Sequence, residues 1–298
     1  MLNEASSGGA DAAVTARDRI QTGSLPDWVI ESSFDLQFKS QHEDPITYLL
    51  SDTQIHAERH ETFIHQAIRL ETMEAVQHWS QWRLQFEPKT QLVTVHSLKI
   101  RRAGSEIDQS NLEKAHLLQR EEGLERFVIH GWFTLLIVLE DVRPGDILEF
   151  SYTIETQSGL FPEHGGYFFS LPQAVSVGKY HFAVQFSSTR QRRWKSSTAD
   201  LRPREILENG MTFWEWSGEN YVGLKPEPNT PTWHISYPWI QVSDFQDWQT
   251  VASGISKAWI TESADETIAT IIREIEDKEP DLSSRIEKAI RLVQDECR

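Results

Sequence analysis

The sequence predicts a mainly β protein, a large antiparallel β-sandwich followed by α-helices at its C-terminal end. Between about residues 25 and 245, apolar and polar residues alternate in short runs that turn signals separate. Two runs within this region are apolar at nearly every position, as in strands that are buried on both faces. After about residue 248 the apolar residues recur every three to four positions, which is the period of a helix.

Composition narrows the class of protein. A length of 298 residues with 39% hydrophobic residues allows a sizeable core, and a net charge of −16 argues against nucleic acid or an anionic membrane as partner. No apolar run approaches the roughly 20 residues that a membrane helix requires, and the N-terminus lacks the pattern of a signal peptide. A single cysteine forms no internal disulfide. We therefore expect a cytoplasmic protein.

The changes in pattern set two boundaries. The first 24 residues are small and polar without a hydrophobic period, so we expect residues 1–24 to be disordered. The change from the strand period to the helix period sets the second boundary. The chain should therefore hold a β-sandwich domain over residues 25–245 and a helical segment over residues 246–298.

The clearest alternation carries Trp82, Leu84 and Phe86 between polar residues, which places one face of a strand in the core and the other in solvent. Pro88-Lys89-Thr90 is a turn signal, and a second apolar run starts at Leu92. We expect these two strands to form a hairpin.

Further along, residues 127–139 and 147–154 are the two apolar runs and predict central strands. The polar residues 108–123 before them should form a loop or a weak helix. Asn209-Gly210 lies between two strand-like runs and predicts a hairpin with a type I′ turn, because both residues accept a positive φ.

Three apolar stripes at helical spacing follow the β region. Ser263-Ala264-Asp265-Glu266 has the form of a capping box, and Pro280 should end the helix that it begins. The last stripe reaches Cys297 without a capping signal, so we expect the chain to be truncated there. The stripes consist of Trp248, Val251, Ile255 and Trp259, then Ile268, Ile271, Ile272 and Ile275, then Leu282, Ile286, Ile290, Val293 and Cys297.

Histidines are the first candidates for chemistry. His56, His60 and His65 lie close together, but a zinc protease needs His-Glu-x-x-His, and here His65 follows His60 one position too late. In a strand His56 and His60 would share a face and His65 would point away. A metal enzyme that uses these residues is one hypothesis for the function, and the weakest that we consider. We favour histidines that lie on the surface or on a strand face.

Cys297 is the only thiol and a candidate nucleophile. Activation needs a histidine or a cationic neighbour, whereas Asp295 and Glu296 would raise the pKa of the thiol, and the apolar stripe indicates burial. The sequence also lacks a Gly-x-Ser-x-Gly elbow and glycine-rich phosphate loops. We therefore predict no catalytic residue, no cofactor-binding residue, no metal ligand and no cofactor for this chain.

Two charged clusters have a structural interpretation beside a functional one. An acidic cluster surrounds Arg143-Pro144-Gly145 and would suit calcium or acid–base chemistry, but proline and glycine favour a charged turn. A basic cluster would suit an anion, but on an acidic chain we favour ion pairing. The acidic cluster is Glu140, Asp141, Asp146 and Glu149, and the basic cluster is Arg190, Arg192, Arg193 and Lys195.

Residues 139–154, Leu-Glu-Asp-Val-Arg-Pro-Gly-Asp-Ile-Leu-Glu-Phe-Ser-Tyr-Thr-Ile, resemble a hallmark of the bacterial DUF3857 family. In that family a similar segment joins two strands of a large β-sandwich. Other matching pieces are Arg69-Leu70, the predicted hairpin from Phe86 to His96, residues 171–175 and residues 238–248. Together they cover about residues 45–250.

The resemblance implies a context. In this family the sandwich is commonly followed by a transglutaminase-like domain of the papain-like Cys-His-Asp class, and residues 293–298 resemble the end of the first helix of that domain. The catalytic cysteine of such domains lies further downstream, so no catalytic residue carries over and this chain alone should be inactive.

The leading hypothesis is therefore a non-catalytic accessory module of a transglutaminase-like cysteine protease or acyltransferase, which positions a protein or peptide substrate for a downstream domain. The alternative is a stand-alone carbohydrate- or peptide-binding module. Its carbohydrate version would use some of the 11 tryptophans as an exposed stacking surface. We favour tryptophans that fill the core of a large sheet, because most of them lie in strand-like alternation.

Overall fold

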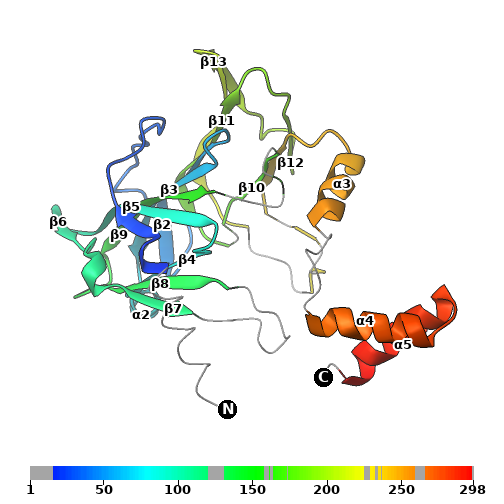
Figure 1. Cartoon of the computed structure of the whole chain (residues 1–298). Helices are drawn as coiled ribbons and strands as arrows, with labels where there is room; N and C mark the ends of the chain where they lie inside the picture. The colour runs from blue at the N-terminus through cyan, green and yellow to red at the C-terminus, as the bar shows by residue number, and fades with distance from the viewer. Residues whose placement is uncertain are drawn as a thin grey trace. The chain divides into compact units, whose positions relative to one another are not determined.

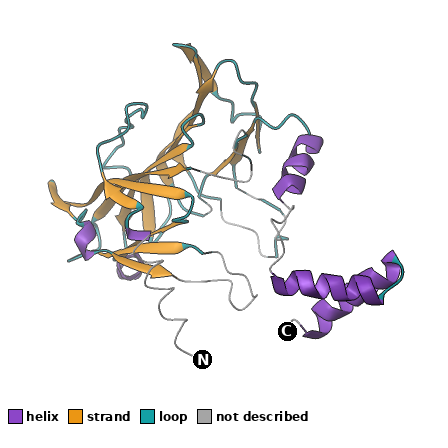
Figure 2. Cartoon of the chain, viewed as in Figure 1, coloured by secondary structure: helices purple, strands orange, loops and turns teal. Residues whose placement is uncertain are grey.

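Strands dominate the first part of the chain and helices the last part (Figures 1 and 2). The computed structural model describes residues 16–119, 131–157, 161, 164–172, 174–224, 229–231, 234–235, 237–258 and 266–296. The chain divides into two units, residues 1–245 and 246–298. The division falls where the hydrophobic period changes from that of a strand to that of a helix.

The described part of the first unit contains the strands and short helical elements. The strands are β1 (Ile20–Thr22), β2 (Ile46–His56), β3 (Glu61–Leu70), β4 (Gln81–Phe86), β5 (Gln91–Arg102), β6 (Ser105–Asp108), β7 (His116–Gln119), β8 (Phe133–Val138), β9 (Ile147–Thr156), β10 (Gly166–Ser170), β11 (Val177–Ser187), β12 (Arg193–Ser196), β13 (Arg204–Glu208), β14 (Met211–Tyr221) and β15 (Trp239–Ser243). The helical elements include α2 (Met73–Trp79) and η1 (Leu112–Lys114).

Three sheets form among the described residues. The large sheet has nine strands in the order β1-β5-β9-β3-β2-β11-β14-β13, with β6 also pairing with β5. The two smaller sheets have the orders β4-β8-β7 and β10-β15-β12. Most neighbouring strands are antiparallel, and the described parallel pairs are β1 with β5 and β2 with β11. The predicted mainly β, largely antiparallel fold is confirmed.

Both small sheets cover the same face of the large sheet. Tyr152 contacts Trp82 of β4 at a ring distance of 6.0 Å. Cross-strand pairs then continue from Tyr152 through Ile64 and Thr53 to Phe182. Because directly paired residues project from the same side of a sheet, Phe182 lies on the same face as Tyr152. Phe182 stacks on a phenylalanine of β10, so the second small sheet lies on that face as well.

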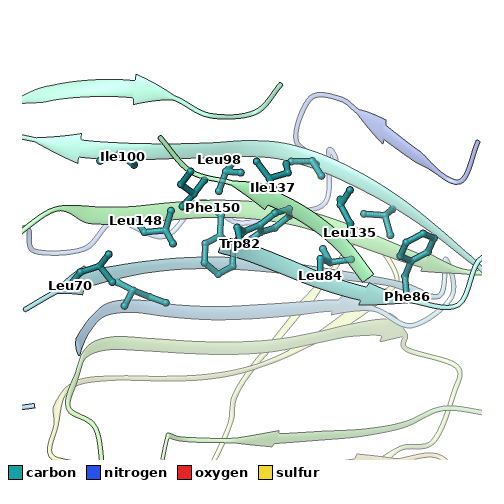
Figure 3. Packing of buried hydrophobic residues seen from close by; sticks show 14 of the residues in the cluster. Leu70, Trp82, Leu84, Phe86, Leu98, Ile100, Leu135, Ile137, Leu148 and Phe150 are labelled. Carbon is teal, nitrogen blue, oxygen red and sulfur yellow. The ribbon is translucent and has the colours of Figure 1, made fainter. Parts of the chain in front are cut away.

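Two hydrophobic cores fill the space between these layers. The first lies between β3-β9-β5 and the β4-β8-β7 sheet, and Trp82 is at its centre with edge contacts to Phe150 and Tyr152 (Figure 3). The second lies between β11-β14 and the β10-β15-β12 sheet, where Phe169, Phe182 and Trp216 stack in sequence.

The predicted hairpin after Phe86 is wrong. Trp82, Leu84 and Phe86 do face the core, but β4 pairs with β8 in a small sheet and β5 pairs with β9 in the large sheet. The turn at Glu87–Gln91 therefore carries the chain from one layer to the other. Alternation shows which face of a strand is buried, but it does not identify the neighbouring strand.

Two further segments differ from expectation. Ala16 is fully buried and Ile20–Thr22 pairs with β5, so residues 16–24 are not disordered, and the rest of the predicted disordered segment lies outside the described residues. Within the predicted loop, His116–Gln119 forms a strand against β8. Both segments are too short to show a period of their own, and pairing with a longer strand makes them regular.

The Asn209-Gly210 hairpin is confirmed. Its two residues have φ values of 51° and 78° and join β13 to β14. Of the two apolar runs, residues 147–154 fall in β9, which lies between β5 and β3 and is buried on both faces. The described part of the other run forms β8, the middle strand of its small sheet.

The second unit consists of helices, namely α3 (Trp248–Ala258), α4 (Glu266–Lys278) and α5 (Leu282–Glu296). Asp281 accepts hydrogen bonds from the backbone N–H groups of Ser283 and Ser284 and so begins α5. Cys297 and most of the predicted capping box lie outside the described residues. Among the described helices, none is long and apolar enough to cross a membrane.

Candidate functional site

The second face of the large sheet is polar, yet much of it is buried. We call it the polar face. Its buried polar members come from β2, β9 and β11, where they alternate with residues of the core. Asp52, Gln54, Glu149, Ser151, Thr153, His181 and Gln185 are all less than 9% exposed. Residues 23–38, the covering segment, run across this face between β1 and β2. A polar sheet face is buried only where another part of the chain lies on it.

Gln54 holds the covering segment by its backbone. Its side-chain nitrogen donates to the carbonyl of Ile30 at 2.6 Å, and its side-chain oxygen accepts from the N–H of the same residue at 2.9 Å. These two bonds reproduce the exchange that a neighbouring strand would make. They involve no side chain of the covering segment.

Two cations bind further carbonyls of the segment. Lys179 Nζ donates to the carbonyl of Ser33 at 2.9 Å, and Arg69 Nη2 donates to the carbonyl of Phe38 at 2.6 Å. A charged donor forms a stronger bond than a neutral one, so both bonds anchor the segment. The segment is thus held in part through backbone groups that every peptide carries, and in part through its own side chains, since Trp28 donates to Glu61 and Asp27 pairs with Arg59.

Two side chains of the segment provide the apolar contacts. Phe34 and Phe38 pack on a small cluster on this side of the sheet. The cluster consists of Leu49, Leu50, Ala67 and Ile147. The side chain of Leu36, between the two aromatic residues, is 42% exposed.

Beneath the segment, His65, Asp52 and His181 are direct cross-strand neighbours on β3, β2 and β11. His181 Nδ1 lies 2.7 Å from Asp52 Oδ1 and 3.4 Å from Ser32 Oγ, and Nε2 lies 3.4 Å from Glu215 Oε1. In a catalytic triad the serine and the carboxylate face opposite ring nitrogens. Here Ser32 and Asp52 both face Nδ1, and Nε2 makes no hydrogen bond to a described residue although Glu215 lies nearby, so the hydrogen-bonded groups do not form a triad.

Glu149 is the centre of a second buried group. It accepts hydrogen bonds from Arg101 and from His65 at 3.1 Å, and Lys99 Nζ lies 3.7 Å away. Burial acts to raise the pKa of Glu149, but the bonds from His65 and Arg101 and the charge of Lys99 outweigh it. The pKa of Glu149 therefore falls to about 2, and the side chain is a carboxylate at neutral pH.

A cavity of about 270 Å³ lies where the covering segment passes over this group. Its polar lining includes His65, His96, Lys99 and Glu149. His96 Nδ1 lies 3.0 Å from the carbonyl of Gly23, and Nε2 lies 2.7 Å from Thr153 Oγ1. Burial lowers the pKa of His96, so the ring is neutral at pH 7 and donates from Nδ1. This histidine is another side chain that holds the segment by its backbone.

The histidines that the sequence singled out do not come together. His56 ends β2, His60 lies in the following turn with a φ of 54°, and His65 is on β3. Burial lowers the pKa of His56, whose ring lies against Trp28 of the covering segment at 5.6 Å. No group of three or more histidine, cysteine, aspartate or glutamate side chains suited to a metal occurs among the described residues.

The acidic cluster forms a turn that ion pairs hold. Gly145 has a φ of 90°, and Asp146 accepts from the N–H of Arg143 at 2.7 Å and from two nitrogens of Arg102, both at 2.7 Å. Asp141 binds Arg102 and Arg143, and the resulting hydrogen bonds lower its pKa. Glu149 does not join this turn, because the next strand carries it to the polar face.

The basic cluster contains a buried member. Arg192 lies between the rings of Tyr167 and Phe186, and its Nη2 is 3.3 Å from Asp244 Oδ2. Asp244 also accepts from the N–H of Gly165 at 2.9 Å. The pair ties β12 to the ends of β10 and β15.

Tryptophans are distributed over both cores and the surface. Trp82, Trp214 and Trp216 are buried, and the exposed ones are Trp132, Trp194 and Trp248. The exposed three lie on different segments of the chain. One exposed aromatic pair, Phe168 with Trp239 at 6.2 Å, lies on the outer face of β10 and β15.

The polar face was not found from the sequence. Asp52, Gln54 and His181 alternate with core residues, and such a pattern normally indicates a solvent-exposed face. The only signal is that the segment which covers them contains apolar residues such as Trp28, Phe34 and Phe38 without strand alternation. That signal does not show where the segment lies.

The fold defines the class, a layered β protein with a nine-stranded main sheet. Within that class, the model of the DUF3857 family, described as a domain of unknown function with solved structures, matches residues 56–224. The match spans more than half of the chain, so the chain belongs to the DUF3857 family. No curated protein matches it.

A solved structure shows the same fold. A crystal structure described as a "putative protease" from Parabacteroides distasonis matches with a TM-score of 0.66 and 14% identity, over 82% of this chain and 48% of that one. This chain thus spans about half the length of that protein. A structure of Legionella pneumophila aminopeptidase A with aspartic acid matches with a TM-score of 0.36 and 11% identity, over 71% of this chain and 22% of that one. A likeness at that score carries no argument.

Proposed function

We propose that this chain is the non-catalytic, substrate-positioning β module of a longer protease or acyltransferase with a transglutaminase-like Cys-His-Asp domain. Membership of the DUF3857 family supports this proposal, as does a fold shared with about half of a protein whose description names a protease. The described residues that come nearest to a catalytic group, Ser32, His181 and Asp52, have the wrong geometry for a triad.

The observation that carries the proposal is the way the polar face binds the backbone of an irregular segment of chain. Gln54, Lys179, Arg69 and His96 bind backbone groups of the covering segment. Contacts to the backbone tolerate many sequences, as in complexes where an extended peptide lies along a sheet. A module that presents polypeptides of varied sequence to a catalytic domain needs this property.

The coding sequence and the activity of the longer protein test the proposal. We expect the reading frame to continue beyond codon 298 into a Cys-His-Asp domain. Deleting the β module should lower kcat/KM for an unfolded protein substrate by about tenfold or more, since binding energy from remote contacts is lost. Cleavage of a short peptide that spans only the catalytic cleft is the matched control and should be unchanged. A stop codon directly after codon 298 would contradict the proposal.

The second candidate is a stand-alone peptide-binding module, which the same backbone contacts favour. The reading frame separates the two hypotheses, because only the first requires a downstream domain. The carbohydrate version of this candidate is weakened by the burial of Trp82, Trp214 and Trp216 in the cores.

A further inference from the structure

We propose that the polar face is a binding surface for a peptide from another polypeptide chain, and that residues 23–38 occupy it in cis. This inference rests on the proposed positioning of polypeptide substrates and adds the surface that would do it. The covering segment is then a competitor that a second peptide displaces.

The contacts of the segment are those of a bound ligand. Gln54 binds both backbone groups of Ile30, and cationic or neutral donors bind the carbonyls of Gly23, Ser33 and Phe38. A second peptide whose backbone followed the same path would offer the same backbone groups.

Side chains add a preference. Phe34 and Phe38 are four residues apart and reach the cluster around Leu49 and Leu50. The surface should therefore prefer a peptide with two aromatic residues at this spacing. The position of Leu36 should accept any residue, because that side chain is 42% exposed.

The segment does not fill the surface that it covers. The cavity of about 270 Å³ lies beside residues 23–32 and has Lys99 and Glu149 in its lining. The side chain of Ile30 is 45% exposed. The exposed part of this apolar side chain therefore contributes no burial energy to the binding of the segment. A peptide whose side chain enters the cavity would compete effectively despite the local concentration of the tethered segment.

The test uses the full chain and a fluorescein-labelled peptide with the sequence of residues 23–38. A full-length variant with Phe34→Ala and Phe38→Ala has a weakened covering segment and should bind the peptide at least about tenfold more tightly than the unmodified chain in fluorescence anisotropy. Leu36→Ala is the matched control from the same segment and should bind as the unmodified chain does. Adding Gln54→Ala to the double variant should reduce the affinity by about tenfold.

Circular dichroism and a thermal melt establish that each variant folds. If the double variant does not fold, hydrogen exchange of the unmodified chain tests the inference. Millimolar peptide should speed exchange within residues 24–38 and leave exchange in β11 unchanged. The inference is overturned if the double variant folds but does not bind the peptide. It is also overturned if that variant fails to fold and the peptide does not change hydrogen exchange in the unmodified chain. The two proposals can fail separately. If the chain binds the peptide but its gene ends at codon 298, the inference stands and the proposed function is wrong. If the reading frame continues but the chain does not bind the peptide, the proposed function stands and the inference is wrong.

Discussion

Glu149 is a buried carboxylate whose environment keeps it charged. Arg101, Lys99 and His65 surround it, and together they outweigh the cost of burial, so its pKa falls from 4.5 to about 2. In the DUF3857 hallmark this glutamate comes three residues after Asp146, but the two carboxylates lie in different environments. Asp146 closes a turn with Arg102, whereas Glu149 binds cations on the polar face.

The pKa of Glu149 makes the stability of the fold depend on pH. A carboxyl group whose pKa is lower in the folded state stabilises that state above its unfolded pKa, and the contribution is lost as pH falls from about 4.5 toward 2. Glu149→Gln should lower the free energy of unfolding at pH 7 by about 3 kcal/mol, because the neutral amide loses the charge interactions with Arg101 and Lys99 that keep the carboxylate ionised. Urea titrations at pH 7 and pH 3.5 check this, and the difference between the two proteins should be smaller at the lower pH. An equal difference in unfolding free energy at both pH values would contradict the lowered pKa of Glu149.

At the same scale, the sequence identified some residues and missed others for physical reasons. Gly145 was placed in a turn because proline and glycine have strong backbone preferences of their own. Gln54 and His181 were missed because their roles depend on a segment that lies beside them only in the folded chain. A polar residue in a strand looks the same in sequence whether water or a backbone covers it.

At the scale of elements, the β13–β14 hairpin follows from local chemistry. Asn209 and Gly210 adopt the positive φ values that the turn requires, and glycine does so without the steric cost of a Cβ atom. The β4–β5 connection was not predictable in this way, because the turn after Phe86 suits a hairpin and a change of layer equally well.

Gly210→Ala isolates the cost of the turn. A Cβ atom at this position meets no neighbouring atom within 4 Å, so only the φ of 78° opposes the substitution. We expect a loss of about 1 kcal/mol in the free energy of unfolding, measured by urea titration. Leu207→Ala on β13, whose side chain is 69% exposed, is the control and should change stability by less than about 0.5 kcal/mol. Equal effects of the two substitutions would show that the turn is not strained by a side chain.

At the scale of the whole molecule, the packing of one sheet on another depends on large aromatic residues. Trp82 lies between the layers at 2% exposure and contacts Phe150 and Tyr152. Burial in the same core raises the pKa of Tyr152 to about 12.

Trp82→Ala should therefore cost about 3–5 kcal/mol in the free energy of unfolding, because it opens a cavity between two sheets. Trp248→Ala in α3 is the matched control, since that side chain is 85% exposed and its loss should cost less than about 0.5 kcal/mol. Thermal or chemical unfolding of both variants measures the contrast. A loss below about 1 kcal/mol for Trp82→Ala would mean that the layers are not packed through this residue.

The parallel pairing of β2 with β11 has a consequence for how the protein is made. Asp52 and His181, neighbours across this pair, are 129 residues apart in the chain. During translation β2, β3, β5 and β9 therefore emerge from the ribosome before β11 is synthesised. The edge of β2 that later pairs with β11 remains unpaired during that time. An unpaired edge that is rich in apolar residues invites association between nascent chains. Slow translation or crowded expression should thus favour aggregation of this protein, and a chaperone that shields the β2 edge should raise its yield.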